Sequence, residues 1–184
     1  MDRESALSIL RLYLTNHNLI KHSLATEACM KGLASRLGGD ELKWGLCGLL
    51  HDIDYEVVKG NMKMHGIEGA RILKEHGFDE EICNAVLSHN DVHGISPYSL
   101  MAKALFCVDP LTGLIVAATL VLPSKSINDL KCENLLNRFK EKNFAKGAKR
   151  EIISKCKEYL DMDLYEFFSI CLEATKLIGK DLGL

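Results

Sequence analysis

Residues 42–54 read LKWGLCGLLHDID, and this stretch decides the fold. Residues 42–50 carry one charge, on Lys43, and leave almost no polar face, as expected for a central helix buried on all sides. Gly45 and Gly48 would each cost such a helix roughly 1 kcal/mol against alanine, so we expect neighbouring helices to approach closely there. The helix nevertheless ends in His51 and Asp52, which both need a polar partner.

The His-Asp pair has two possible explanations. An ionised aspartate at the end of a buried helix is unfavourable by several kcal/mol or more unless its charge is compensated. A divalent cation would satisfy both His51 and Asp52, because imidazole and carboxylate groups are common ligands of first-row metals. A hydrogen-bonded Asp–His pair at the helix end would do so equally well. The dipeptide alone leaves both interpretations open.

Helical spacing of apolar residues recurs along the chain, and no segment shows sustained alternation with a period of two. The predicted helices span residues 3–15, 18–37, 40–53, 62–76, 79–90, 98–108, 110–122, 127–141, 147–159 and 163–181. Gly38-Gly39 before Asp40, and Gly77 before Asp79, mark ends and caps between them. Short connections between so many helices predict an all-α fold, an antiparallel multi-helix bundle.

The character of the chain changes after Leu122. Between Lys125 and Lys157 there are ten Lys or Arg residues against four Asp or Glu. We therefore predict a helical core at residues 1–122 that carries the His-Asp pair. Residues 123–184 are expected to form a helical C-terminal extension that packs on this core and stays outside the site.

The overall composition restricts the partners. The chain has 184 residues, 47% of them hydrophobic, which fits one domain with or without an appended subdomain. A formal net charge of -2 gives no global reason to expect nucleic acid or an acidic membrane. The basic segment 125–157 makes RNA or polyanion binding a rival function, but it offers only Phe139 and Phe144 for base stacking, so we do not favour a nucleic-acid partner. The sequence gives no indication of the oligomeric state.

The sequence favours a soluble, cytoplasmic protein without membrane segments. Its first residues, MDRESALSILRLYL, are too polar for a signal peptide. The apolar stretch from Leu114 to Leu122 is much shorter than the roughly 20 residues that span a bilayer. The seven cysteines include no CxxC pair, which suggests neither a disulfide framework nor a thiolate zinc site and fits a reducing compartment.

Candidate ligands stand on both sides of the His-Asp pair. His22 lies 29 residues before His51 on a helix with an apolar stripe, and Asp109 follows the apolar stretch 100–108. This order on apolar helices resembles the HD-domain superfamily of metal-dependent phosphohydrolases over residues 20–122, and CGLLHDI, residues 47–53, is its most specific piece. The resemblance implies a divalent metal held by His22, His51, Asp52 and Asp109.

His65 and His89 occupy positions where binuclear branches of the superfamily place extra histidines, and in those branches the aspartate of the pair bridges two ions. By resemblance, both would be metal ligands. Asn90 follows His89 where the binuclear signalling phosphodiesterases have a second histidine, so one ion or two remain possible. The metal would be manganese, iron, cobalt, nickel, zinc or magnesium.

Asp109 has a second possible role because Pro110 follows it. A residue before proline is disfavoured in helical geometry, and proline favours the first position of a helix. Asp109 could therefore simply cap the helix 110–122. The two roles are compatible if one carboxylate oxygen binds the metal, and we keep Asp109 as a ligand because of the family resemblance.

The resemblance implies hydrolysis of a phosphoester bond, in a nucleotide or a similar small phosphorylated compound, by a metal-activated water. Asp52 would hold the metal, and Asp54 or Glu56 would position the water or protonate the leaving group, unless the latter two belong to a solvated loop. Candidate substrate-binding side chains are those of Lys59, Lys63, Arg71, His93 and Lys103. For the four cations, an ordinary charged surface is the alternative.

Two other classes of function stay open. A catalytically idle HD-like module would use the cavity to sense a ligand or dock a partner, although a retired site has no reason to keep buried charges. A metal-dependent lyase or oxygenase could be built on the same helices. His17 and His76 are expected outside the site, since His76 would lie roughly 16 Å from His65 along a helix.

Overall fold

The computed structural model describes all 184 residues, of which 67% are helical and none form strands. This confirms the all-α prediction. The elements in chain order are α1 (Arg3–Tyr13), α2 (His17–Leu37), α3 (Glu41–Leu50), α4 (Ile67–Glu75), α5 (Glu80–His89), the short 3-10 helix η1 (Asp91–His93), α6 (Leu100–Leu120), the 3-10 helix η2 (Ile127–Asp129), α7 (Cys132–Lys140), α8 (Arg150–Ile153), α9 (Cys156–Leu160), α10 (Leu164–Leu177) and α11 (Gly179–Leu182).

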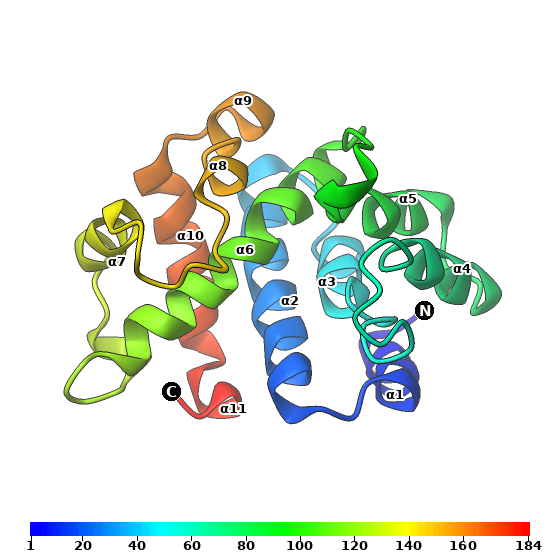
Figure 1. Ribbon diagram of the computed structural model, residues 1–184, viewed down its shortest axis with the longest axis horizontal. Coiled ribbons are helices and arrows are strands. Elements are labelled where there is room, and N and C mark those ends of the chain that lie inside the picture. Colours follow the sequence, from blue (N-terminus) through cyan, green and yellow to red (C-terminus); the bar gives the residue numbers. More distant parts are fainter.

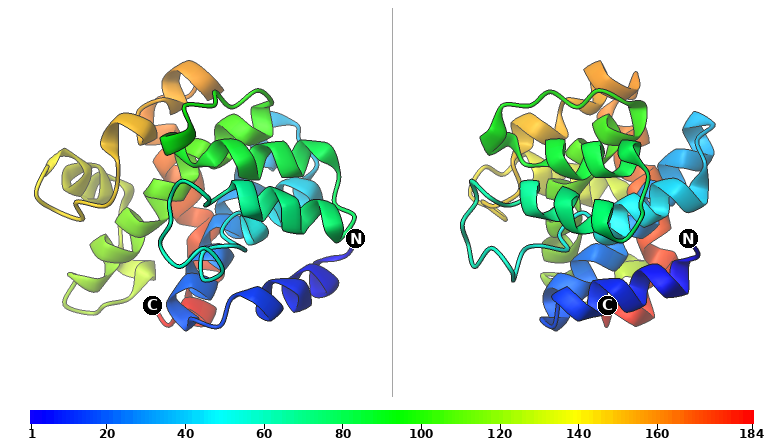
Figure 2. Two further views of the ribbon diagram at one scale, coloured as in Figure 1. Left: turned by 45° about the vertical axis from the view of Figure 1, so that its right-hand side comes forward. Right: turned by 90° about the vertical axis from the view of Figure 1, so that its right-hand side faces the viewer.

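Helices α2, α3 and α6 form the centre of the bundle, and the remaining helices surround them (Figure 1). α4 and α5 lie side by side on one flank, and α10 packs against α2 on the other (Figure 2). Every residue of α3 from Trp44 to Leu50 is buried. The prediction of a helix enclosed on all sides is therefore correct.

Polar side chains begin the helices where the sequence predicted them. Asp40 Oδ1 accepts the N–H of Lys43 at 3.0 Å, and Asp79 Oδ1 accepts that of Ile82 at 3.0 Å. Gly38 ends α2 in the left-handed conformation, with φ of 73°. These caps satisfy backbone groups that the helix itself leaves free.

Several predicted helices are longer than those observed. α3 ends at Leu50 and α4 begins at Ile67, so residues 51–60 and 62–66 form turns instead of helix. The polar side chains of His51, Asp52, Asp54 and His65 are buried here, a pattern that apolar periodicity does not register. The predicted helix 127–141 begins only at Cys132, and the predicted helix 147–159 divides into α8 and α9.

The predicted break at Asp109 is wrong, because α6 runs without interruption from Leu100 to Leu120 with Pro110 inside it. Proline removes one intrahelical hydrogen bond and costs a helix interior about 3 kcal/mol or more. Packing outweighs this cost, since α6 contacts helices from both halves of the chain. Asp109 is therefore not a cap; Ser99 caps α6 through a bond from the N–H of Ala102.

α6 is also the one helix long and apolar enough, by length and composition, to cross a membrane. In the bundle, 61% of its apolar window is buried inside the structure. The core helix of a soluble protein passes the same test, so α6 is weak evidence for a membrane segment.

The C-terminal helices share the core of the N-terminal ones. Phe167 and Phe168 of α10 are fully buried in a single hydrophobic cluster that extends from α1 to α10. Cys29 of α2 donates its thiol to the carbonyl of Cys171 at 3.5 Å. Residues 123–184 therefore pack on the helices of residues 1–122, while a functional division at Pro123 stays a prediction.

We expect Gly48→Ala to lower the melting temperature by several degrees. A Cβ at Gly48 would lie 2.8 Å from the backbone carbonyl oxygen of Thr26, so α2 and α3 would have to separate. Overpacking of this kind costs about 1–3 kcal/mol, and each kcal/mol corresponds to about 2–4 °C in a domain of this size. Thermal unfolding followed by circular dichroism measures the effect.

Gly45→Ala is the matched control in the same helix. Its Cβ would meet only the side chain of Lys31, which is 36% exposed and can move. We expect Gly45→Ala to lower the melting temperature less than Gly48→Ala does. Equal losses in both variants would show that the close approach at Thr26 does not explain Gly48.

Candidate metal centre

The His-Asp pair lies in the first turn after α3, inside the bundle. The side chain of His51 is fully buried and that of Asp52 is 8% exposed. His51 Nδ1 donates to the carbonyl oxygen of Gly48 at 2.8 Å. This bond directs Nε2 toward Asp52 Oδ1, 3.4 Å away. The end of α3 at Leu50 thus places an imidazole and a carboxylate at the centre of the fold.

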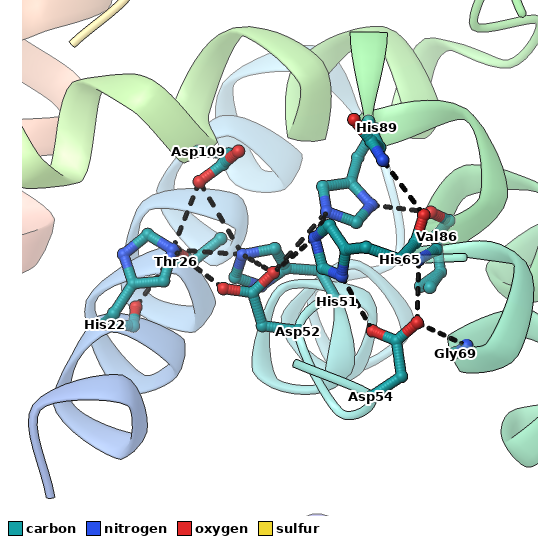
Figure 3. A network of polar contacts seen from close by, with 12 residues as sticks. His22, Thr26, His51, Asp52, Asp54, His65, Gly69, Val86, His89 and Asp109 are labelled. Atoms are coloured by element: carbon teal, nitrogen blue, oxygen red, sulfur yellow. Dashed lines mark hydrogen bonds and ion pairs between the residues drawn. The ribbon is translucent and has the colours of Figure 1, made fainter. Parts of the chain in front are cut away.

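Four histidines share one arrangement, in which Nδ1 donates to a fixed acceptor and Nε2 faces a common centre (Figure 3). They are His22, His51, His65 and His89. Their acceptors are, in the same order, Thr112 Oγ1 at 2.9 Å, the Gly48 carbonyl at 2.8 Å, Asp54 Oδ1 at 2.9 Å and the Val86 carbonyl at 2.5 Å. An imidazole that donates from Nδ1 keeps a lone pair on Nε2, as metal-binding histidines do.

Thr112 determines the orientation of His22. Its hydroxyl donates to the backbone carbonyl of Asp109 at 2.9 Å, which leaves its oxygen lone pairs to accept from His22 Nδ1. One threonine in α6 therefore links a histidine of α2 to the aspartate of α6.

Two carboxylates lie among the four Nε2 atoms. Asp52 Oδ1 is 3.4, 3.2 and 3.5 Å from Nε2 of His51, His65 and His89. Asp52 Oδ2 faces His22 Nε2 at 3.5 Å, and Asp109 Oδ1 lies 3.1 Å from the same atom. Asp52 is thus the one carboxylate that contacts all four imidazoles.

These side chains fit divalent metal ions. One atom from each of His22, His51 and Asp109 lies within 4.8 Å of the others, and the same holds for His51, Asp52 and His89. Imidazole nitrogens and carboxylate oxygens without thiolates suit first-row metals such as manganese, iron, cobalt, nickel or zinc. Two adjoining groups with Asp52 between them are consistent with one ion or with two.

Protons supply the positive charge of the cluster when no cation does. Burial lowers the pKa of His51, but the charges of Asp52 and Asp109 outweigh it and raise that pKa to about 9. Burial is likewise outweighed at His65, where bonds to Asp52 and Asp54 raise the pKa to about 10. Burial alone would raise the pKa values of Asp52 and Asp109. The neighbouring histidines lower them more strongly, so both pKa values lie below their usual range.

Asp54 is fully buried and holds His65 in place. One oxygen accepts from His65 Nδ1, and the other accepts the N–H groups of Gly66 and Gly69 at 2.7 and 2.9 Å. The carboxylate thus sits at the N-terminus of α4, where the helix dipole stabilises negative charge. Gly66 has φ of 86°, and a Cβ on Gly69 would lie 3.0 Å from Val86 Cγ1 and 3.3 Å from the Asp54 carboxylate, so both positions favour glycine.

We expect Asp54→Asn to weaken metal binding about 10–100-fold, the usual effect of losing the carboxylate that orients a metal-binding histidine. The amide keeps the shape but loses the charge that fixes His65. Competition against a fluorescent chelator measures the affinity. Glu56→Gln, outside the cluster, should leave it unchanged; similar losses in both variants would contradict this role of Asp54.

The structure brings together the six predicted ligands, His22, His51, Asp52, His65, His89 and Asp109. Glu56 lies away from these ligands. Its carboxylate accepts hydrogen bonds from the backbone N–H groups of Thr15 and Asn16, just before α2. Asp54, although close, uses both oxygens to hold His65 and α4. Neither carboxylate is therefore placed to donate a proton to a leaving group.

None of the predicted cations reaches the cluster. Lys59 and Lys63 are exposed, Arg71 pairs with Glu68 and Glu75 on the surface of α4, and Lys103 lies over the ring of Tyr159. His93 Nε2 hydrogen-bonds the backbone carbonyl of His65 and does not line the cavity. His76 bonds the hydroxyl of Tyr13, and His17 is exposed, both away from the cluster as expected.

A cavity of about 350 Å³ opens over the cluster. Apolar walls from Leu19, Tyr55, Met62, Phe106, Pro110 and Ile152 surround the ligands. Lys149 also lines it, and sequence analysis missed this residue because the basic segment 125–157 was expected to stay outside the site. A larger hollow of about 540 Å³ among α1, α2 and α10 contains none of the ligands.

Comparison with known proteins finds proteins named Ribonuclease Y and an uncharacterised protein. A Ribonuclease Y from Lawsonia intracellularis is 30% identical over 169 residues, which are 90% of this chain and 31% of that protein. A Ribonuclease Y from Geobacillus thermodenitrificans is 30% identical over 173 residues, 90% of this chain and 32% of that protein. An uncharacterised protein from Methanocaldococcus jannaschii is 42% identical over 91 residues, 45% of this chain and 50% of that protein.

The chain spans about a third of the length of the Ribonuclease Y proteins that it matches. No solved structure matches it. The sequence model of the HD domain family matches residues 19–119, more than half of the chain. All six clustered side chains fall within this range. The chain therefore belongs to the HD domain family, whose members are metal-dependent hydrolases.

Proposed function

We propose that the protein is a metal-dependent phosphohydrolase that cleaves a phosphoester bond of a nucleotide or a similar small phosphorylated compound. One observation carries the proposal: four imidazole Nε2 atoms and two carboxylates face one another at the floor of a cavity. The four buried members of the cluster, His51, Asp52, His65 and His89, also argue against an idle module, because charged groups buried for no purpose would only destabilise the fold.

The six clustered side chains would hold the metal. A bound divalent cation polarises a phosphoryl oxygen and activates a water for attack. The protein's own contribution is to present each Nε2 in the metal-binding tautomer and to keep Asp52 and Asp109 ionised. Asp54 fixes His65, and the apolar walls limit how much water reaches the reacting phosphate.

The position of Asp52 supports two ions, because its Oδ1 faces His65 and His89 while its Oδ2 faces His22. With two ions bound, Asp52 would be a ligand of both. Manganese, iron, cobalt, nickel or zinc suits the imidazole-rich set better than magnesium, which prefers oxygen ligands.

RNA cleavage is a second candidate function. The relatives named Ribonuclease Y match 90% of this chain, although this chain covers only about a third of them. Lys149, from the basic segment, lines the cavity and would face a polyanion that entered it. The expectation of no nucleic-acid partner relied on net charge and aromatic content, and this likeness now weighs against it.

The experiment begins with the metal content of the protein as purified. Phosphomonoesters, phosphodiesters, dinucleotides and short RNA are then offered with several divalent metals, beside Asp52→Asn prepared identically. We expect hydrolysis of at least one small phosphoester that depends on metal and on Asp52. Cleavage of RNA alone would favour the second candidate, and metal-loaded protein inert toward every substrate would contradict both.

The seven unpaired, buried cysteines support the further proposal of a reducing location such as the cytoplasm.

A further inference from the structure

Apart from the clustered histidines, the cavity over the metal centre is lined by a single cationic side chain. Asp52, Asp91 and Asp109 line it, and Lys149 is the only lysine or arginine among its 15 lining residues. A phosphoester brings negative charge, and a cationic side chain is needed for the part that the metal does not neutralise. Lys149 is the one side chain of this type that lines the cavity.

The loop that presents Lys149, residues 141–149 between α7 and α8, is held in a fixed shape. The next residue, Arg150, uses all five N–H donors of its guanidinium on backbone carbonyls. The acceptors are the carbonyl oxygens of Phe139, Glu141, Phe144, Ala145 and Ala148. These five hydrogen bonds hold the loop so that the backbone of Lys149 lies at the cavity rim, without help from the metal ligands.

Asp91 holds the ammonium group of Lys149 at this rim. Lys149 Nζ lies 2.6 Å from Asp91 Oδ1, and the two side chains are 46% and 37% exposed. Ion pairs as exposed as this one contribute little to stability, so Lys149 can exchange Asp91 for a stronger partner. A phosphate oxygen is such a partner, because it carries more charge and accepts a charge-assisted hydrogen bond.

We propose that Lys149 binds a phosphate oxygen of the substrate, and that Asp91 competes with the substrate for the same ammonium group. The assignment rests on the phosphohydrolase function proposed above and adds a substrate-binding residue to it. Lys149 lies outside residues 19–119, the part that matches the family, so this contact belongs to the C-terminal part of this chain.

The test measures binding of inorganic phosphate to the full-length protein loaded with Mn²⁺, by isothermal titration calorimetry, together with metal content. Lys149→Ala should weaken phosphate binding about tenfold, as expected for the loss of a charge-assisted hydrogen bond, and should retain its metal. Lys149→Arg should keep most of the affinity. The matched control is Lys146→Ala, which removes the same charge from the same loop at an exposed position outside the cavity.

Asp91→Asn should act in the opposite direction. Without its competitor, Lys149 is free for phosphate, and binding should tighten by about two- to fivefold, the range expected for an exposed ion pair. In the Lys149→Ala background the same change should have a smaller effect, because the competition no longer exists. The difference between the two backgrounds is the coupling that a double-mutant cycle isolates.

Three results would overturn the proposal: equal phosphate affinity in wild type and Lys149→Ala, an equal loss in Lys146→Ala, or no phosphate binding by the metal-loaded wild type. Phosphate binding is measured without turnover, which separates this proposal from the proposed function. If Lys149→Ala loses phosphate binding but the wild-type protein hydrolyses no phosphoester, only the proposed phosphohydrolase function is refuted. Hydrolysis with unchanged KM and phosphate affinity in Lys149→Ala would refute only the role of Lys149.

Discussion

Asp52→Asn should leave the protein almost free of metal and without hydrolase activity. Asp52 is the one carboxylate that contacts all four clustered imidazoles, and the amide preserves its shape while removing its charge. Losing the hydrogen-bond partner of a metal ligand costs about 10–100-fold in affinity or activity, and losing a central ligand should exceed this. Metal analysis by mass spectrometry and turnover of the best phosphoester measure the two effects.

His76→Ala is the control, since His76 bonds Tyr13 away from the cluster. It should retain full metal and activity. Full metal retention by Asp52→Asn together with metal loss from His76→Ala would show that the ligand assignment is wrong.

Removing the metal should lower the melting temperature by about 5–10 °C. A ligand present at about 100 times its Kd adds about 2.7 kcal/mol to the free energy of unfolding, and each kcal/mol corresponds to about 2–4 °C here. Differential scanning calorimetry with and without a chelator measures the shift, and added manganese or iron should reverse it. An unchanged melting temperature after verified metal removal would contradict a stabilising metal centre.

The fall in melting temperature on metal removal should become larger as the pH rises. The raised pKa values of His51 and His65, about 9 and about 10, apply to the metal-free cluster. The charged and titratable groups facing them are His22, Asp52, Asp54, His89 and Asp109. A histidine whose pKa is higher in the folded than in the unfolded protein stabilises the fold. This contribution is complete below the pKa of the unfolded state, about 6.5, and is lost as the pH rises through the pKa of the folded state. Metal-free protein should therefore melt progressively lower from about pH 6.5 to 10, whereas metal binding, which displaces protons, strengthens over the same range.

The sequence predicted the central helix and the clustered side chains well, because each leaves a local signal. An apolar helix that ends in His51 and Asp52 is visible in residues 42–54, and the other ligands follow at recognisable positions. The continuous α6 was not predictable from Asp109-Pro110, since the local rule favours a break. Tertiary packing on both faces of α6 outweighs that rule, and packing leaves no trace in neighbouring residues.

The surroundings of the site were harder to predict than its ligands. Asp54 and Glu56 look alike in the sequence, yet one lies at the N-terminus of α4 and the other at the start of α2. Lys149 stands 97 residues after Asp52 and meets the cavity only through the shape of its loop. The nearer cations were favoured by their sequence position, but none of them lines the cavity.

The bond between Asp54 and His65 closes a loop, residues 55–64, whose two ends are thereby fixed. Gly60, near its exposed tip, has φ of 81° and open space around it. Each doubling of the length of such a loop costs only about 0.6 kcal/mol. Tyr55 and Met62 of the loop form part of the cavity wall. Insertions at Gly60 are therefore expected to reshape the cavity wall while the clustered side chains stay in place, so the wall of the cavity and the groups at its floor can evolve separately.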